Sequence, residues 1–222
     1  MSTREPVTFY FDFISPYAYL AWKRVYAVAE AQGRAVDPAP VLFAAMLDAH
    51  GTKGPAEVPA KRVYVFKDAS RRAALAGLPL VPPPAHPFNP LLALRVASLD
   101  LDEELRRAVI DALFDATWGG GPGVTDPATV ASIVSRAGVD GEAALREAGT
   151  DAVKRRVRER TDEAIARGVF GVPTLYVDGD IFWGYESLDL AALRMEARDP
   201  MDEALLARWK DLPAGATRPG AG

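Results

Sequence analysis

Residues 7–22, VTFYFDFISPYAYLAW, decide the fold, because an apolar segment there runs directly into a serine followed by a proline. The β-branched and aromatic side chains of residues 7–13 predict a short buried strand. Ser15 and Pro16 are typical of a helix start, since a serine oxygen can accept from an orphan N–H group and proline fits the first turn. The apolar spacing that follows predicts a helix that ends near Gly33. The first unit is therefore a strand followed by a helix.

Three further segments predict the rest of a sheet. Residues 35–43 indicate a second strand, parallel to the first because a helix crosses between them, and its two prolines favour an outer position. Residues 174–177 and 181–183 indicate a hairpin whose turn is Asp178-Gly179. Residues 44–59 carry glycines and prolines with little periodicity, so we expect a loop that wraps over the domain, where loops often contact ligands.

The middle of the chain is helical in pattern. A proline-rich segment at 77–90 and a glycine-rich segment at 119–123 separate the helices of an inserted bundle. We expect helices at 59–76, 89–100, 103–118, 127–137 and 141–167 in this bundle, and at 188–197 and 201–209 after the hairpin. The tail at 211–222 is rich in proline and glycine and is expected to fray.

Composition excludes several classes of function. About half of the 222 residues are apolar, enough for a sizeable core, and the net charge of −4 shows no basic stripe for nucleic acid. The chain has no cysteine, so it cannot use disulfides, thiolate metal sites or redox chemistry of its own thiols. With two histidines only, we predict no metal. The start resembles neither a signal peptide nor a membrane span, and we expect a soluble cytoplasmic protein without a membrane partner.

Ser15 lies where a helix start would form an anion site, because the unpaired N–H groups and the helix dipole favour negative charge. A serine hydroxyl there can donate to a sulfur anion and lower the pKa of a bound thiol. No serine–histidine–carboxylate arrangement is visible around it, so covalent attack by Ser15 lacks a base. The alternative is that Ser15 only caps the helix. A second element, Val172-Pro173 before the hairpin, is weak evidence when taken alone.

Together these features resemble the 2-hydroxychromene-2-carboxylate isomerases and the related kappa-class glutathione transferases, over about residues 7–193. The residues that carry the resemblance are 11–17 (FDFISPY), 59–62 (PAKR) with Tyr64 and Asp68, Trp118-Gly119, 170–174 (FGVPT) and 182–184 (FWG). Redox relatives have Cys-x-x-Cys at the helix start. Ser15 and Ala18 occupy those places here, so dithiol exchange is excluded.

The resemblance implies an α/β protein with a thioredoxin-like fold and a large all-helical insertion. Residues 1–58 and 168–222 would form the thioredoxin-like, glutathione-binding domain, and residues 59–167 the inserted helical domain. The resemblance also implies a homodimer that acts on a small aromatic substrate, in the degradation of aromatic compounds.

For the cofactor, the resemblance implies that glutathione binds with Ser15 as the catalytic residue. Pro173 should be cis, and the main chain of Val172 should pair with the cysteinyl part of the ligand. Gly184, Tyr185 and Glu186 match the stretch that holds the γ-glutamyl end. Here the chain departs from the family, because Tyr185 replaces a small polar residue, while Glu186 keeps the carboxylate that can meet the ligand's ammonium group.

Substrate contacts are less sharply indicated. Lys61, with its neighbour Arg62, could face an acidic substrate, although on an exposed helix such side chains are most often solvated. His86 and Asn89 follow the family's position for the second-substrate pocket. The alternative for Asn89 is a cap on the next helix.

Other residues carry weaker expectations. Many relatives place an asparagine where this chain has Glu57, which weakens any role for Glu57. For Asp68, as for Lys61, the alternatives are a contact with the ligand or substrate and a solvated position on an exposed helix. Trp118 and the phenylalanines at 9, 11 and 13 are expected in the core.

The leading hypothesis is a glutathione-dependent isomerase of 2-hydroxychromene-2-carboxylate or a similar aromatic carboxylate, in which the thiolate stabilised by Ser15 acts as a borrowed nucleophile. The first alternative is a kappa-like transferase or peroxidase that consumes glutathione. The second is a non-catalytic thioredoxin-fold binding protein, which predicts no affinity for glutathione.

Overall fold

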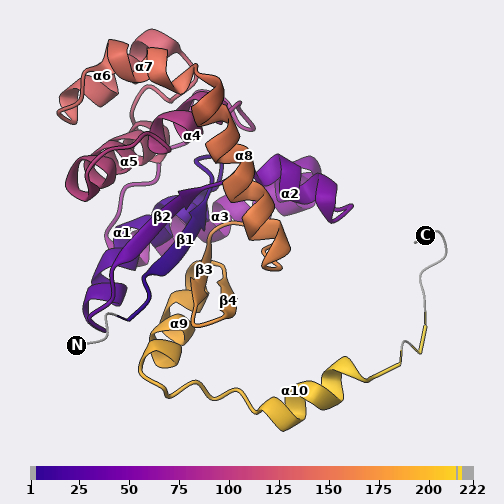
Figure 1. Ribbon diagram of the computed structural model, residues 1–222. Coiled ribbons are helices and arrows are strands. Elements are labelled where there is room, and N and C mark those ends of the chain that lie inside the picture. The colour runs from indigo at the N-terminus through magenta and orange to yellow at the C-terminus, as the bar shows by residue number, and fades with distance from the viewer. Residues whose placement is uncertain (1–3, 214, 217–222) are drawn as a thin grey trace.

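The computed structural model describes residues 4–213 and 215–216 and contains a mixed four-stranded sheet with strand order β2-β1-β3-β4 (Figure 1). The strands are β1 (Val7–Phe11), β2 (Val36–Pro40), β3 (Thr174–Val177) and β4 (Asp180–Trp183). β1 pairs with β2 in parallel and with β3 antiparallel, and β3 and β4 form the hairpin. The parallel pairing, the outer place of β2 and the hairpin are therefore confirmed.

The helices occupy most of the remaining described chain. They are α1 (Pro16–Glu30), α2 (Phe43–Ala49), α3 (Pro59–Ala76), α4 (Leu91–Ala97), α5 (Glu103–Trp118), α6 (Pro127–Arg136), α7 (Gly141–Ala148), α8 (Asp151–Ala166), α9 (Leu188–Met195) and α10 (Glu203–Lys210), with short 3-10 turns η1 (Pro55–Glu57) and η2 (Tyr185–Ser187). No helix among the described residues is long and apolar enough to span a membrane.

Two expected segments were wrong. Residues 44–59 were expected as a loop, yet α2 forms there, because Ala44, Ala45 and Met46 favour a helix and the Asp12 carboxylate accepts the N–H of Phe43 at its start. The single helix expected at 141–167 is two helices, since the chain breaks at 149–150 and Thr150 Oγ1 caps α8.

Alternation along β1 divides the core between the two faces of the sheet. Phe9 and Phe11 pack with α1, and the core on that side continues to Phe114 of α5, whose ring centroid lies 4.7 Å from that of Phe13. On the opposite face, Tyr10 packs with residues of α2 and α8. The expected burial of the phenylalanines at 9, 11 and 13 and of Trp118 is confirmed.

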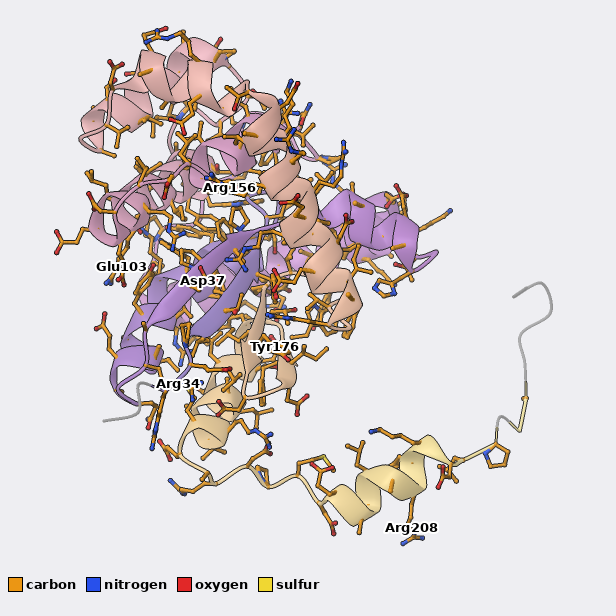
Figure 2. All side chains as sticks on the ribbon, viewed as in Figure 1. Arg34, Asp37, Glu103, Arg156, Tyr176 and Arg208 are labelled. Carbon is orange, nitrogen blue, oxygen red and sulfur yellow. The ribbon has the colours of Figure 1, made fainter. Side chains whose placement is uncertain are left out.

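The helical region and the sheet are joined by this common core and by charge. Asp37 of β2, labelled in Figure 2, pairs with Arg160 of α8 at 2.7 Å and with Arg106 of α5 at 3.6 Å. The division into domains at 58/59 and 167/168 stays a prediction. α8 packs on the face of the sheet that carries Tyr10 (Figure 1). α5 reaches the opposite face through Phe114, whose ring centroid lies 5.4 Å from that of Phe11.

The end of the described chain stands apart. α10 has no buried residue and projects away from the other elements (Figure 1). Of the tail expected to fray, residues 214 and 217–222 lie outside the described residues.

Candidate active site around Ser15

Ser15 is the N-cap of α1 and is partly exposed. Its Oγ accepts the N–H of Ala18 at 3.2 Å, and its hydroxyl donates to the carbonyl oxygen of Val172 at 3.4 Å. Pro16 fills the first turn, as the sequence predicts. The capping alternative therefore describes a real contact, but the same hydroxyl also faces the loop before β3.

That loop carries a cis peptide between Val172 and Pro173, so the expected isomer is confirmed. The N–H of Gly184 donates to the carbonyl oxygen of Pro173 at 2.9 Å, which brings the segment after β4 against the loop. Hydrogen bonds thus join three distant parts of the sequence: the start of α1 at Ser15, the loop at Val172 and the start of η2.

Glu186 and Tyr185 of η2 differ in exposure to solvent. Glu186 is exposed, and its carboxylate sits beside Gly184, where an added Cβ would lie 3.1 Å from Oε2. Tyr185 is 9% exposed, and the guanidinium groups of Arg24 and Arg72 lie 5.1 and 5.8 Å from its ring centroid. The tyrosine side chain is therefore packed, while the glutamate is open to a ligand.

A polar cluster links Tyr17, near the start of α1, to Asp68 and Arg72 of α3. The Tyr17 hydroxyl donates to Asp68 Oδ2 at 2.8 Å, and Arg72 Nε donates to the same oxygen at 2.6 Å. Burial, reinforced by the bond to Asp68, raises the pKa of Tyr17, whereas Arg72 lowers the pKa of Asp68. Tyr17 is therefore a neutral phenol at physiological pH, and Asp68 has a structural partner. A pocket of about 470 Å³ beside this cluster is lined by Lys23, Arg24, Arg72, Leu75, Ala76, Leu78 and Tyr185.

Asp12 is a residue of this region that the sequence analysis did not single out. It is 1% exposed, and its carboxylate oxygens accept the N–H groups of Ile14 at 3.1 Å and Phe43 at 3.0 Å. Burial opposes the charged form more than the two donors favour it, and it raises the pKa of Asp12 to about 7. Its position inside the apolar segment at 7–13 was the sequence signal that could have indicated a buried carboxylate.

The substrate candidates are placed along α3 and the segment that follows it. Lys61 is exposed and makes no hydrogen bond or ion pair with the described residues, whereas Arg62 donates to the carbonyl oxygen of His86 at 2.9 Å. The ring of His86 lies with Nε2 3.1 Å from the carbonyl oxygen of Ile14. Asn89 accepts the N–H of Leu91 at 3.0 Å, a local bond at the start of α4, although the N-cap residue of that helix is Pro90.

The side chain of Glu57 makes a local hydrogen bond, in which its Oε1 accepts the N–H of Gly54 at 2.6 Å.

Two aromatic side chains to which the sequence analysis gave no role flank the cis loop. Phe170 is 42% exposed and Trp183 is 53% exposed, and their ring centroids lie 5.0 Å apart. Among the described residues, no cluster of three or more acidic or histidine side chains could hold a metal.

Residues 6–196 match the family model of the DSBA-like thioredoxin domain. The chain belongs to that family. It is also 31% identical to a 2-hydroxychromene-2-carboxylate isomerase of Pseudomonas putida over 82% of this chain and 90% of the relative. A solved 2-hydroxychromene-2-carboxylate isomerase superposes with a TM-score of 0.77 at 29% identity, over 94% of this chain and 99% of that one. Within the DSBA-like family, the chain is therefore an enzyme of the isomerase branch, and the expected thioredoxin-like fold with its helical insertion is confirmed.

A more distant relative is a kappa-class glutathione transferase. Glutathione S-transferase kappa 1 of Rattus norvegicus is 25% identical over 82% of this chain and 87% of its own length.

Proposed function

We propose that the protein is a glutathione-dependent isomerase that acts on 2-hydroxychromene-2-carboxylate or a similar aromatic carboxylate. The observation that carries the proposal is the contact between the Ser15 hydroxyl and the carbonyl oxygen of Val172 at 3.4 Å, beside a cis proline, in a chain without cysteine. Glutathione would supply the thiolate nucleophile that the chain itself lacks.

The donors at the start of α1 fit a thiolate. Pro16 has no N–H group, and the N–H of Ala18 is taken by Ser15. The N–H of Tyr17 has no partner among the described residues, as expected in a first helical turn. The Ser15 hydroxyl can turn from Val172 toward a sulfur, so two donors would stabilise negative charge there and lower the pKa of a bound thiol.

The remaining parts of glutathione have matching groups. The main chain of Val172 would bind the cysteinyl residue as an added strand does. The exposed carboxylate of Glu186 would meet the γ-glutamyl ammonium group, and Gly184 and Tyr185 would contribute main chain only, since the Tyr185 ring is packed. We propose Lys61 as a cation for the substrate carboxylate, with His86 and Asn89 as secondary candidates that already bind main-chain groups.

The substrate's aromatic body needs apolar surface near the sulfur. Phe170 and Trp183 expose such surface next to the cis loop. Their position supports an aromatic substrate over a purely polar one.

The test is conversion of 2-hydroxychromene-2-carboxylate, followed by its absorbance, with glutathione, with S-methylglutathione and without either. We expect conversion with glutathione only, and the glutathione concentration should stay constant through many turnovers. Folded protein that converts the substrate equally well with S-methylglutathione would refute a role for the thiol.

The second candidate is a kappa-like transferase or peroxidase, favoured by the relationship to kappa-class transferases. The same site would serve it. Loss of free thiol in proportion to product would establish this alternative in place of isomerisation.

We further propose that the protein works in the cytoplasm, where reduced glutathione is held in excess, and as a homodimer, as the resemblance implies. Light scattering on the purified chain measures the second property directly, and a monomer at micromolar concentration would contradict it.

A further inference from the structure

The peptide group between Ile14 and Ser15 is hydrogen-bonded at both ends. The N–H of Ser15 donates to the carbonyl oxygen of Asp12 at 3.1 Å, and the carbonyl oxygen of Ile14 lies 3.1 Å from Nε2 of His86. Because a peptide group is planar, two such bonds fix the orientation of its plane. The plane in turn fixes the position of the Cα of Ser15, from which its Cβ and hydroxyl project.

The preceding peptide group, between Phe13 and Ile14, is held in the same way. The N–H of Ile14 donates to Asp12 Oδ1 at 3.1 Å, and the carbonyl oxygen of Phe13 accepts the indole N–H of Trp118 at 2.8 Å. In both peptides, Asp12 holds the N–H side, and a ring from the helical region holds the carbonyl side.

The contact with Ile14 determines the tautomer of His86. A carbonyl oxygen only accepts hydrogen bonds, so Nε2 must carry the hydrogen. Nδ1 is buried and has no hydrogen-bond partner among the described residues. A proton there would be an unsatisfied buried donor, and burial together with the charge of Arg62 lowers the pKa of His86. His86 is therefore neutral with its hydrogen on Nε2.

Three aromatic rings hold the His86 ring in place. The ring centroids of Phe66, Trp118 and Phe88 lie 5.1, 5.7 and 6.3 Å from its own. The backbone of His86 is also tied to α3, because Arg62 donates to its carbonyl oxygen. A donor fixed this firmly is suited to hold the turn before Ser15 in one orientation.

We propose that His86 is a positioning residue for Ser15: its Nε2–H holds the carbonyl of Ile14 and so aims the Ser15 hydroxyl at the thiolate of bound glutathione. This inference rests on the proposed function of Ser15. It gives His86 a role in the chemistry through Ser15, which needs no contact between the imidazole and glutathione.

Three substitutions separate the donor from the packing. His86→Phe keeps an aromatic ring and removes the donor, His86→Asn carries an amide too short to reach Ile14, and His86→Gln places an amide N–H near the former Nε2. For the Phe and Asn variants we expect kcat to fall on the order of tenfold with little change in KM. The pKa of the bound thiol, read from thiolate absorbance, should rise by about one unit, and Gln should restore most of both.

His50 supplies the matched control. Its Nε2 lies 3.3 Å from the carbonyl oxygen of Val169, so it also contacts a main-chain carbonyl, but outside the turn before Ser15. His50→Phe should leave the thiol pKa and kcat unchanged.

The tautomer is tested without glutathione, by nitrogen NMR of protein labelled at histidine. The chain has two histidines, so spectra of the His50→Phe variant assign both. We expect His86 to carry its hydrogen on Nε2 from neutral to mildly acidic pH. A hydrogen on Nδ1 overturns the proposal, and so does glutathione binding with unchanged thiol pKa and kcat in the Phe or Asn variant. A wild-type protein that binds no glutathione overturns the proposed function and the role of His86 together.

Discussion

The hydroxyl of Ser15 and the carbonyl oxygen of Val172 lie 3.4 Å apart, although the two residues are separated by 157 positions in the sequence. The first belongs to a helix start and the second to the loop before β3. Their contact joins the start of α1 to the main chain of the loop that carries the cis proline, so the proposed thiolate donor and the proposed main-chain partner of glutathione lie side by side.

Replacing Ser15 by alanine removes both the cap of α1 and the proposed thiol donor. We expect the free energy of unfolding to fall by about 1 kcal/mol from the lost cap. The pKa of bound glutathione should rise by about one unit or more, because a hydrogen bond to the charged sulfur is lost. Calorimetric unfolding and ultraviolet titration of the bound thiol measure the two effects.

Thr150→Ala is the control for the stability effect alone. Thr150 caps α8 with its Oγ1, 3.4 Å from the N–H of Val153. The Thr150→Ala variant should lose a similar free energy of unfolding, and the pKa of the bound thiol should stay unchanged. Equal thiol pKa values in the Ser15 variant and the wild type would mean that Ser15 only caps α1 and does not donate to the thiolate.

Replacing Asp12 by asparagine should change how stability depends on pH. The pKa of Asp12 is about 7 in the folded protein, against about 3.8 for an ordinary aspartate, so the folded state binds an extra proton between these values. Stability therefore falls as pH rises from about 4 to about 7, by about 4 kcal/mol for a shift of this size, and is then constant as far as this group is concerned. Urea unfolding of both proteins across this range should show the decline in the wild type and its absence in Asp12→Asn. Parallel curves would mean that Asp12 is charged in the folded protein throughout.

Replacing Tyr17 by phenylalanine separates its side chain from its main chain. The variant loses the hydrogen bond to the Asp68 carboxylate and should be destabilised by about 1–2 kcal/mol. The pKa of bound glutathione should not change, because the proposed donor is the main-chain N–H. Tyr64→Phe, at an exposed position of α3, controls for loss of a tyrosine hydroxyl. A rise in thiol pKa for Tyr17→Phe alone would assign the phenol to the site.

Replacing Glu186 by glutamine should weaken glutathione binding through its γ-glutamyl ammonium group. Glu186 is exposed, so solvent screens the pair, and we expect a three- to fivefold increase in Kd. Cysteinylglycine lacks the γ-glutamyl residue and should bind the variant and the wild type equally. Glu203→Gln on α10 is the charge-matched control. Titration calorimetry that shows equal losses for both ligands would place Glu186 elsewhere in the site.

Local patterns predicted much of the fold. The apolar run at 7–13, the cap at Ser15-Pro16 and the turn at Asp178-Gly179 carry their structure in neighbouring residues, and the corresponding elements form as expected. The helix at 43–49 was missed because part of its start is stabilised by Asp12, whose contribution no local window reveals. The break at 149–150 was hidden by strong helix formers on both sides.

The sequence by itself determined that any sulfur chemistry must use a borrowed thiol, because the chain has no cysteine, and that Ser15 begins a helix, because capping depends on neighbours in the chain. Tertiary structure alone decided which groups meet Ser15. The contacts with Val172 and, through Ile14, with His86 join distant segments. The raised pKa of Asp12 likewise follows from its burial, a property of the packed protein that no stretch of sequence contains.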